Sequence, residues 1–171
     1  CLSKGLTGGY MPMSITVVRE KIYDAFYADW SEGKAFMHSH TYAGNPLGCA
    51  AALAVLDILD EENVLEKAEE TALWLTTRME EVFGAHRNVG EIRHIGLIHA
   101  AELVEDKREK RPFDARRRLG YTIYRTSLRH GLVLRPLGDV LYFNPPLNIE
   151  KEELEVAICC MKQAMDEVLE A

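Results

Sequence analysis

The sequence predicts an α/β fold in which the last part of one α/β domain is followed by a smaller α+β domain. Short apolar segments punctuated by glycine and proline alternate with long stretches of helical periodicity, and the pattern changes to that of strands at Gly90. With 171 residues, 47% of them hydrophobic, the chain can bury a core. We place the boundary after Glu61, so that residues 1–61 end the first domain and residues 62–171 form the second.

The first part of the chain combines short strands, a glycine-rich turn and a loop. Apolar residues predict strands at 1–3 and 14–18, joined by a turn that holds three glycines and followed by a short helix through Tyr27. Residues 29–43 are polar and aromatic without a period, which indicates a loop.

Two long helices follow this loop. Asn45 and Pro46 favour the N-cap and first position of a helix, which predicts that the first one starts there. Its expected buried face consists of Leu47, Ala50, Ala51, Ala54, Val55, Ile58 and Leu59. The second runs from Val64 to Phe83, with Gly84 as its C-terminal cap. Its apolar stripe consists of Val64, Ala68, Ala72, Leu75, Met79 and Val82.

The remaining elements are expected to complete the small α+β domain. Residues 90–104 read as strands, residues 114–130 as a helix ended by Gly131, and residues 132–143 as a hairpin that turns at 137–139. The last helix is amphipathic. Its apolar residues are Leu154, Ala157, Ile158, Met161, Met165 and Val168.

Charge and composition argue against several classes of partner. The net charge is −7 and the pI is about 5.4, and the only basic run is 116–118, so nucleic acid is not an expected partner. No stretch approaches the roughly 20 apolar residues that span a bilayer, so no membrane association is expected. Four cysteines without a paired or zinc-type spacing fit a reducing cytoplasm. His38 and His40 lack a third ligand nearby, so no metal site is predicted and we expect a structural or pocket-wall role.

The segment SKGLTGGYMP, residues 3–12, is the first candidate for chemistry. It places Lys4 at a strand end, before glycines that let the backbone approach a flat ligand closely. A lysine forms a Schiff base with an aldehyde only as the neutral amine, which partial desolvation or a nearby cation would favour. The alternative is a surface lysine beside a turn, which is the common situation for this residue type.

Together with HTYAGNPLGCAAALAVLDIL at residues 40–59 and RPLGDVLYFNPPL at 135–147, this segment resembles the class III aminotransferases. The resemblance covers the whole chain. It implies the C-terminal part of the large domain of a fold-type I transferase that depends on pyridoxal 5'-phosphate (PLP), followed by the small domain. It also implies a homodimer that acts on small-molecule substrates, with Lys4 as the lysine that carries the cofactor.

The same resemblance assigns the other expected site residues. Thr41 would bind the cofactor phosphate from the neighbouring subunit of a dimer, and Tyr42, next to it in sequence, is also expected to bind the cofactor. Arg135 would take the substrate carboxylate, for which its planar guanidinium is well suited, and Gly9 and Tyr10 would line the same pocket. Without the resemblance, Thr41 could equally be a turn residue that is hydrogen-bonded to its own backbone, and Arg135 could be an exposed arginine on a strand.

Within the class, the run EGKAFMHSHTYAGNPLGCAAALAVL resembles a subgroup that aminates an oxo acid in biotin biosynthesis, with S-adenosylmethionine or lysine as donor. Two alternatives stay open: another class III activity, on omega-amino acids or diamines, or a non-catalytic module that folds or dimerises. The family's glycine-rich phosphate loop, ring-stacking aromatic residue and cofactor aspartate precede the lysine and have no counterpart in this sequence. Because the chain also starts at Cys1, we expect an N-terminal part to be missing and the chain to be inactive alone.

Overall fold

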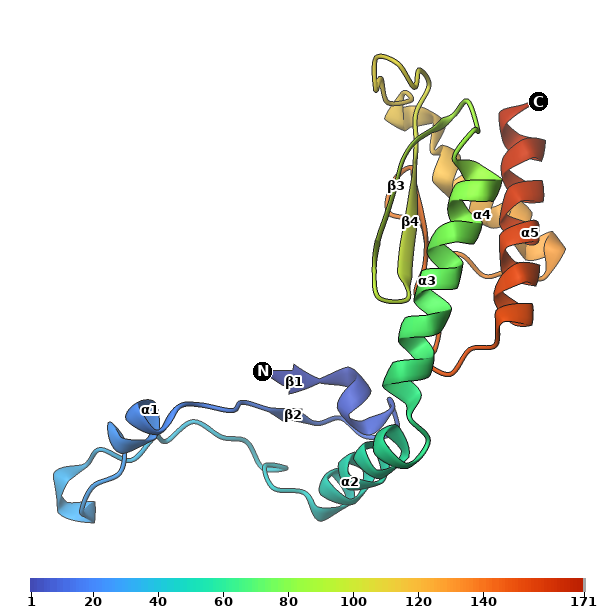
Figure 1. Ribbon diagram of the computed structural model, residues 1–171. Helices are drawn as coiled ribbons and strands as arrows, with labels where there is room; N and C mark the ends of the chain where they lie inside the picture. Colours follow the sequence, from blue (N-terminus) through green and yellow to red (C-terminus); the bar gives the residue numbers. More distant parts are fainter. Residues whose placement is uncertain (171) are drawn as a thin grey trace. The chain divides into compact units, whose positions relative to one another are not determined.

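The computed structural model describes residues 1–170, which separate into two compact units, Cys1–Asn63 and Val64–Ala171. The division lies two residues beyond the boundary expected from the sequence. Both units combine helices with antiparallel strands (Figure 1). No helix within residues 1–170 is long and apolar enough to cross a membrane.

The first unit contains one small sheet and one long helix. Its elements are β1 (Leu2–Ser3), the 3-10 turn η1 (Lys4–Thr7), β2 (Ser14–Ile15), α1 (Glu20–Asp24), the 3-10 turn η2 (Trp30–Glu32) and α2 (Pro46–Glu61). Strands β1 and β2 are antiparallel, with Leu2 opposite Ile15. The expected strand at 14–18 is therefore only two residues long, and the glycine-rich turn contains a turn of 3-10 helix.

Helix α2 begins as predicted but does not bury the expected face. The Asn45 side-chain oxygen accepts a hydrogen bond from the Leu47 amide at 3.1 Å, and Pro46 is the first helical residue. Within the helix only Gly48 and Ala52 are buried, whereas most of the predicted apolar stripe is exposed. The helix packs against η1, so only the side that faces this turn is covered in the first unit.

The second unit is a three-stranded sheet packed against helices (Figure 1). Its elements are α3 (Val64–Phe83), β3 (Val89–Ile95), β4 (Ile98–Leu103), the 3-10 turn η3 (Ala115–Arg117), α4 (Leu119–Ser127), the 3-10 turn η4 (Leu128–His130), β5 (Val140–Phe143) and α5 (Lys151–Leu169). The strand order is β3-β4-β5, all antiparallel. In β4 every second side chain is buried, as expected when one face of a sheet is covered by helices.

The core of the second unit lies between the sheet and α3, α4 and α5. The predicted stripes of α3 and α5 supply part of it, including Leu75 and Met79 from α3 and Ile158 and Met161 from α5, all fully buried. Full burial of one such side chain contributes about 1.5–3 kcal/mol. The second unit therefore contains the main hydrophobic core of the described residues.

Three local predictions in this unit are wrong. The expected helix at 114–130 is interrupted at Arg118, whose left-handed backbone (φ 48°, ψ 46°) cannot continue a right-handed helix. The expected hairpin at 132–143 has only its tight turn and second arm, because β5 pairs with β4 instead. Gly84 is not a left-handed cap; it fits because an added Cβ would lie 2.4 Å from the Glu80 carbonyl oxygen.

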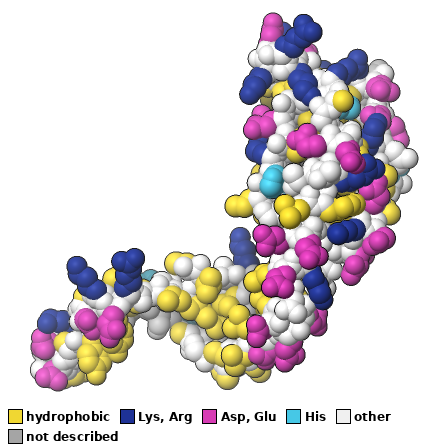
Figure 2. Space-filling model, in the orientation of Figure 1, with side chains coloured by type: hydrophobic (Ala, Val, Ile, Leu, Met, Phe, Trp, Pro, Cys, Tyr) yellow, Lys and Arg dark blue, Asp and Glu magenta, His cyan; other side chains and the backbone are white. Residues whose placement is uncertain are grey.

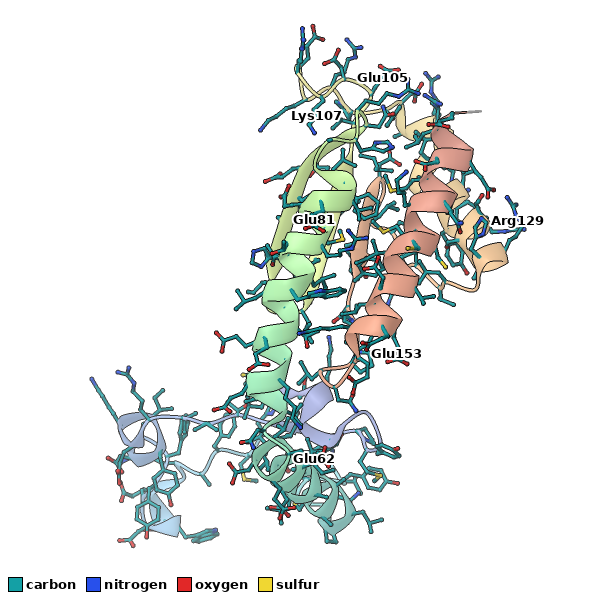
Figure 3. All side chains as sticks on the ribbon, turned by 45° about the vertical axis from the view of Figure 1, so that its right-hand side comes forward. Glu62, Glu81, Glu105, Lys107, Arg129 and Glu153 are labelled. Atoms are coloured by element: carbon teal, nitrogen blue, oxygen red, sulfur yellow. The ribbon has the colours of Figure 1, made fainter. Side chains whose placement is uncertain are left out.

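The two units present different side chains at their surfaces (Figure 2). In the first unit, large apolar side chains are exposed, among them Trp30 at 97% and Met37 at 92%. In the second unit, charged side chains such as Glu81 on α3 and Glu105 and Lys107 in the loop after β4 project from the surface (Figure 3). Lys107 also donates to the carbonyl of Gly84, so it binds the C-terminal end of α3.

Candidate functional site

A cavity of about 1010 Å³ lies within the first unit, where η1, the segment before β2 and the start of α2 meet. Three of the residues predicted for the site line it: Lys4, Gly9 and Tyr42. The other lining residues are Ser3, Met11, Pro12, Met13, Ser14, His40, Ala43, Gly44, Asn45 and Gly48. Segments from both ends of this unit therefore contribute to one hollow.

Lys4 is positioned by an abrupt change of backbone direction. Strand β1 ends at Ser3, which is extended, and Lys4 itself is left-handed with φ 54°. Left-handed backbone is uncommon for residues other than glycine, and such strained residues are enriched at functional sites. The next residues form η1, closed by a hydrogen bond from the Gly8 amide to the Gly5 carbonyl at 3.0 Å. The lysine therefore stands at the junction of a strand and a tight turn.

Thr7 holds the glycine-rich turn in shape, and sequence reasoning did not single it out. Its hydroxyl donates to the Met11 carbonyl at 2.6 Å, its own carbonyl accepts from the Tyr10 amide at 3.0 Å, and the residue is only 1% exposed. Gly9 lies inside this closed loop with φ 82°, a conformation that favours glycine. A threonine between glycines in a turn is the sequence signal that could have indicated this role.

The second expected cofactor segment is a turn that ends at Asn45. The Ala43 amide donates to the His40 carbonyl at 2.9 Å, and the Asn45 amide donates to the Tyr42 carbonyl at 3.1 Å. His40 and Tyr42 line the cavity, whereas Thr41, between them, is exposed and does not. A threonine that serves a neighbouring subunit would have to face outward in this way.

Tyr10 and Arg135 lie outside this cavity. Tyr10 is 89% exposed. Arg135 belongs to the second unit, where it lines a separate hollow of about 770 Å³ together with Arg118 and Tyr121. The first unit thus brings Lys4, Gly9 and Tyr42 onto one cavity that Thr41 and Tyr10 do not line, while Arg135 lines a hollow of the second unit.

The groups around the first cavity suit a polar ligand that carries an aldehyde. The Lys4 amine can form a Schiff base. Two serine hydroxyls, the His40 imidazole and the Tyr42 phenol can exchange hydrogen bonds with oxygen atoms of a ligand. Gly9 leaves open space beside the backbone, with no heavy atom within 4 Å of the position that a Cβ would take. The residues present therefore fit a flat, oxygen-rich aldehyde.

A strand-end lysine beside such a cavity is the arrangement expected for covalent capture of an aldehyde cofactor. The family model described as aminotransferase class-III matches residues 1–165. The chain belongs to the class III aminotransferase family. The predicted fold class is thereby confirmed, and the chain spans about 37% of the length of the curated relatives compared below.

Three similar proteins illustrate the match. A curated protein of Anoxybacillus flavithermus named adenosylmethionine-8-amino-7-oxononanoate aminotransferase is 42% identical over 99% of this chain and 37% of its own length. The structure of the Methanocaldococcus jannaschii protein of that name is 35% identical with a TM-score of 0.91, over 97% of this chain and 38% of that one. An amine transaminase from an uncultivated Pseudomonas species, described as PLP-bound, is 33% identical with a TM-score of 0.87, over 97% and 37%.

Proposed function

We propose that this chain supplies the cofactor lysine of a PLP-dependent aminotransferase. The observation that carries the proposal is Lys4 itself: a lysine at a strand end, in left-handed backbone, on the wall of a cavity lined by hydroxyl groups and glycines. Family membership supports the cofactor assignment, because class III aminotransferases use PLP. When bound, PLP supplies the electron sink that transamination requires.

The residues of this chain have distinct tasks in this proposal. The Lys4 amine holds the cofactor and then moves a proton to and from the substrate carbon, as general base and acid. The turn closed by Thr7 keeps the Gly9 backbone beside the cavity, and Tyr42 bounds its other side. Thr41 is proposed to bind the phosphate group of the PLP that the neighbouring subunit of a homodimer holds, which the exposure of Thr41 permits.

For the substrate, we propose the conversion of 8-amino-7-oxononanoate to 7,8-diaminononanoate in biotin biosynthesis, within the cytoplasm. S-adenosylmethionine or lysine would be the amino donor, and Arg135 would bind the carboxylate. The names of the Anoxybacillus and Methanocaldococcus relatives support this choice. The Pseudomonas amine transaminase, at 33% identity, is nearly as similar as the Methanocaldococcus protein at 35%, so a different class III donor and acceptor pair is the second candidate. A donor screen with the complete enzyme separates the two.

The first experiment is reductive labelling. The chain is mixed with PLP, reduced with borohydride and digested, and the modified peptide is mapped. We expect the adduct on Lys4 and its loss in Lys4→Arg, because a guanidinium does not form this linkage. Lys34 is the matched control, since it is exposed in the same unit and paired with Glu32 at 2.7 Å. An adduct on another lysine would show that the assignment of Lys4 is wrong.

Activity is a separate question from labelling. We expect the 171-residue chain to show no transamination alone, because other parts of the family's site precede the lysine. Turnover by this chain without a partner would contradict that expectation. A complete failure to form any adduct would instead favour the second class of function, a non-catalytic module that folds or dimerises.

A further inference from the structure

The hollow in the second unit has both charged and apolar walls. It measures about 770 Å³ and lies between the segment that leads into α4 and the turn before β5. Arg118 and Arg135 are its two cationic lining residues, and Glu102 and Asp139 its two anionic ones. Its apolar lining residues include Phe113, Val133, Leu134 and Pro136.

The two carboxylates of the hollow already have partners. Glu102 accepts from the Arg93 guanidinium at 2.5 Å, and Asp139 accepts from the Gly120 amide at 3.0 Å. By contrast, neither Arg118 nor Arg135 forms an ion pair with any carboxylate in residues 1–170. Two guanidinium groups with unused donors can bind an anion in the hollow, against the one negative charge of Asp139, whose hydrogen-bond partner is a neutral amide.

Arg118 is positioned by its backbone conformation and by an aromatic ring. Its left-handed backbone separates η3 from α4, and its guanidinium carbon lies 4.5 Å from the centre of the Tyr121 ring. Gly120 fixes the start of α4 against the turn before β5, because an added Cβ would lie 2.0 Å from the Gly138 carbonyl oxygen. The pKa of Tyr121 is lowered, first by the hydrogen bond with Arg125 and also by Arg118.

Only the last arginine of the 116–118 run lines the hollow. Arg116 pairs with Asp114 at 2.7 Å, and Arg117 lies over the Phe113 ring, 5.1 Å from its centre. We propose that Arg118 is a specificity-determining residue that, with Arg135, binds the carboxylate end of an aliphatic substrate. The apolar walls then take the carbon chain. This inference rests on the proposed function for the role of Arg135, and it adds a second guanidinium to that site.

The test is a titration of the 15N-labelled chain with hexanoate in the absence of PLP. Binding is measured from the changes in the amide chemical shifts of Gly138 and Val140. We expect saturable binding and a dissociation constant about tenfold higher in Arg118→Gln, as for loss of one charge-assisted hydrogen bond. Arg118→Lys keeps the charge but loses the fork and should lie between the two. Arg116→Gln is the matched control and should bind as the original chain does.

Several outcomes would overturn the inference. The inference is wrong if Arg118→Gln and Arg116→Gln bind hexanoate with equal affinity. It is also wrong if hexanoate does not bind, or if the uncharged analogue 1-hexanol binds equally well. Circular dichroism and urea unfolding show whether each variant is folded, and Arg118→Lys carries the test if Arg118→Gln is not.

Failure of this inference can be distinguished from failure of the proposed function. If Lys4 takes no PLP but hexanoate binding depends on Arg118, the proposed function fails and the carboxylate site stands. If Lys4 is labelled and Arg118→Gln binds normally, only the present inference fails.

Discussion

The His99 Nε2 atom on β4 lies 2.9 Å from the hydroxyl of Thr76 on α3, which joins the sheet to a helix inside the second unit. The Thr76 hydroxyl also donates to the Ala72 carbonyl at 2.9 Å, so it accepts from Nε2–H of the histidine. Nδ1 is then the ring's acceptor, and it is buried with no hydrogen-bond partner among residues 1–170. Burial of the ring disfavours a second proton on it.

This geometry predicts that the second unit loses stability as the pH falls. Burial lowers the pKa of His99 below its usual 6.5. A hydrogen bond with the Leu97 backbone offsets part of this effect, and the His94 ring, stacked at 4.9 Å, lowers the pKa further. The unfolded chain therefore takes up a proton before the folded one, and stability present above pH 6.5 declines below it. Urea unfolding at pH 7.5 and 5.5 measures the decline.

The control for this pH effect is His99→Leu, which removes the titrating ring. We expect a smaller pH dependence, with a remainder from His86, whose pKa is also lowered, chiefly by burial. An unchanged pH dependence in the variant would exclude His99 as its source.

Removing the partner of His99 should also destabilise the fold. In Thr76→Val the Nε2–H group of His99 remains buried without an acceptor, which costs about 1–3 kcal/mol. Thr76→Ser keeps the hydroxyl and should lose less. Chemical unfolding of both variants at pH 7.5 checks this, and equal stability of the two would show that the hydrogen bond is unimportant.

Helices α3 and α5 are joined by a bidentate ion pair between Arg78 and Glu155. Arg78 donates through Nε and a terminal nitrogen to the two carboxylate oxygens of Glu155, at 2.8 and 2.7 Å. We expect Arg78→Lys to lower the urea midpoint, because lysine cannot make both bonds. Glu81→Gln is the control, since it removes the partner of Arg78 on α3 but leaves the link to α5. A larger effect of the control would contradict this account.

Gly120 is the glycine whose replacement should be most costly in the second unit. A Cβ there would lie 2.0 Å from a backbone oxygen of Gly138, which has no flexible side chain to move away. Gly120→Ala should destabilise by roughly 2 kcal/mol or more, because overpacking shifts the backbone. Thr122→Ala, exposed on the same helix, should change stability by about 0.5 kcal/mol or less. Thermal unfolding compares the two.

Asn45 offers a local test in the first unit. Asn45→Ala removes the acceptor of the Leu47 amide and should weaken the start of α2 by about 1 kcal/mol. Hydrogen exchange at the Leu47 amide should accelerate in Asn45→Ala and stay slow in Asn45→Asp, which can still accept the bond. Equal exchange in both variants would argue against the cap.

Regular periodicity explains which parts of the fold the sequence could predict. The limits of α3 agree with the prediction because its apolar stripe finds its partners within the same unit. The stripe of α2 has the same kind of pattern, yet most of it is exposed, since a periodic pattern indicates a face without indicating what covers it.

The residues that line the candidate site could be predicted where they belong to a local sequence motif. Features that depend on contacts between distant segments could not. Lys4, Gly9 and Tyr42 belong to two motifs, and the structure places all three on one cavity. After the break at Arg118, the start of α4 is held by a hydrogen bond from the Gly120 amide to Asp139, 19 residues away in sequence. No local rule contains that contact, so a continuous helix was predicted.

The left-handed backbone at Lys4 sets the stability of the fold against the proposed role of this residue. A residue with a Cβ gives up on the order of 1 kcal/mol in this conformation, whereas glycine adopts it freely and asparagine more easily than lysine. Selection for thermal stability alone would therefore enrich Lys4→Gly or Lys4→Asn, and either change would discard the amine. Under the proposed function, the stability that the chain forgoes at this position is the cost of keeping an amine there.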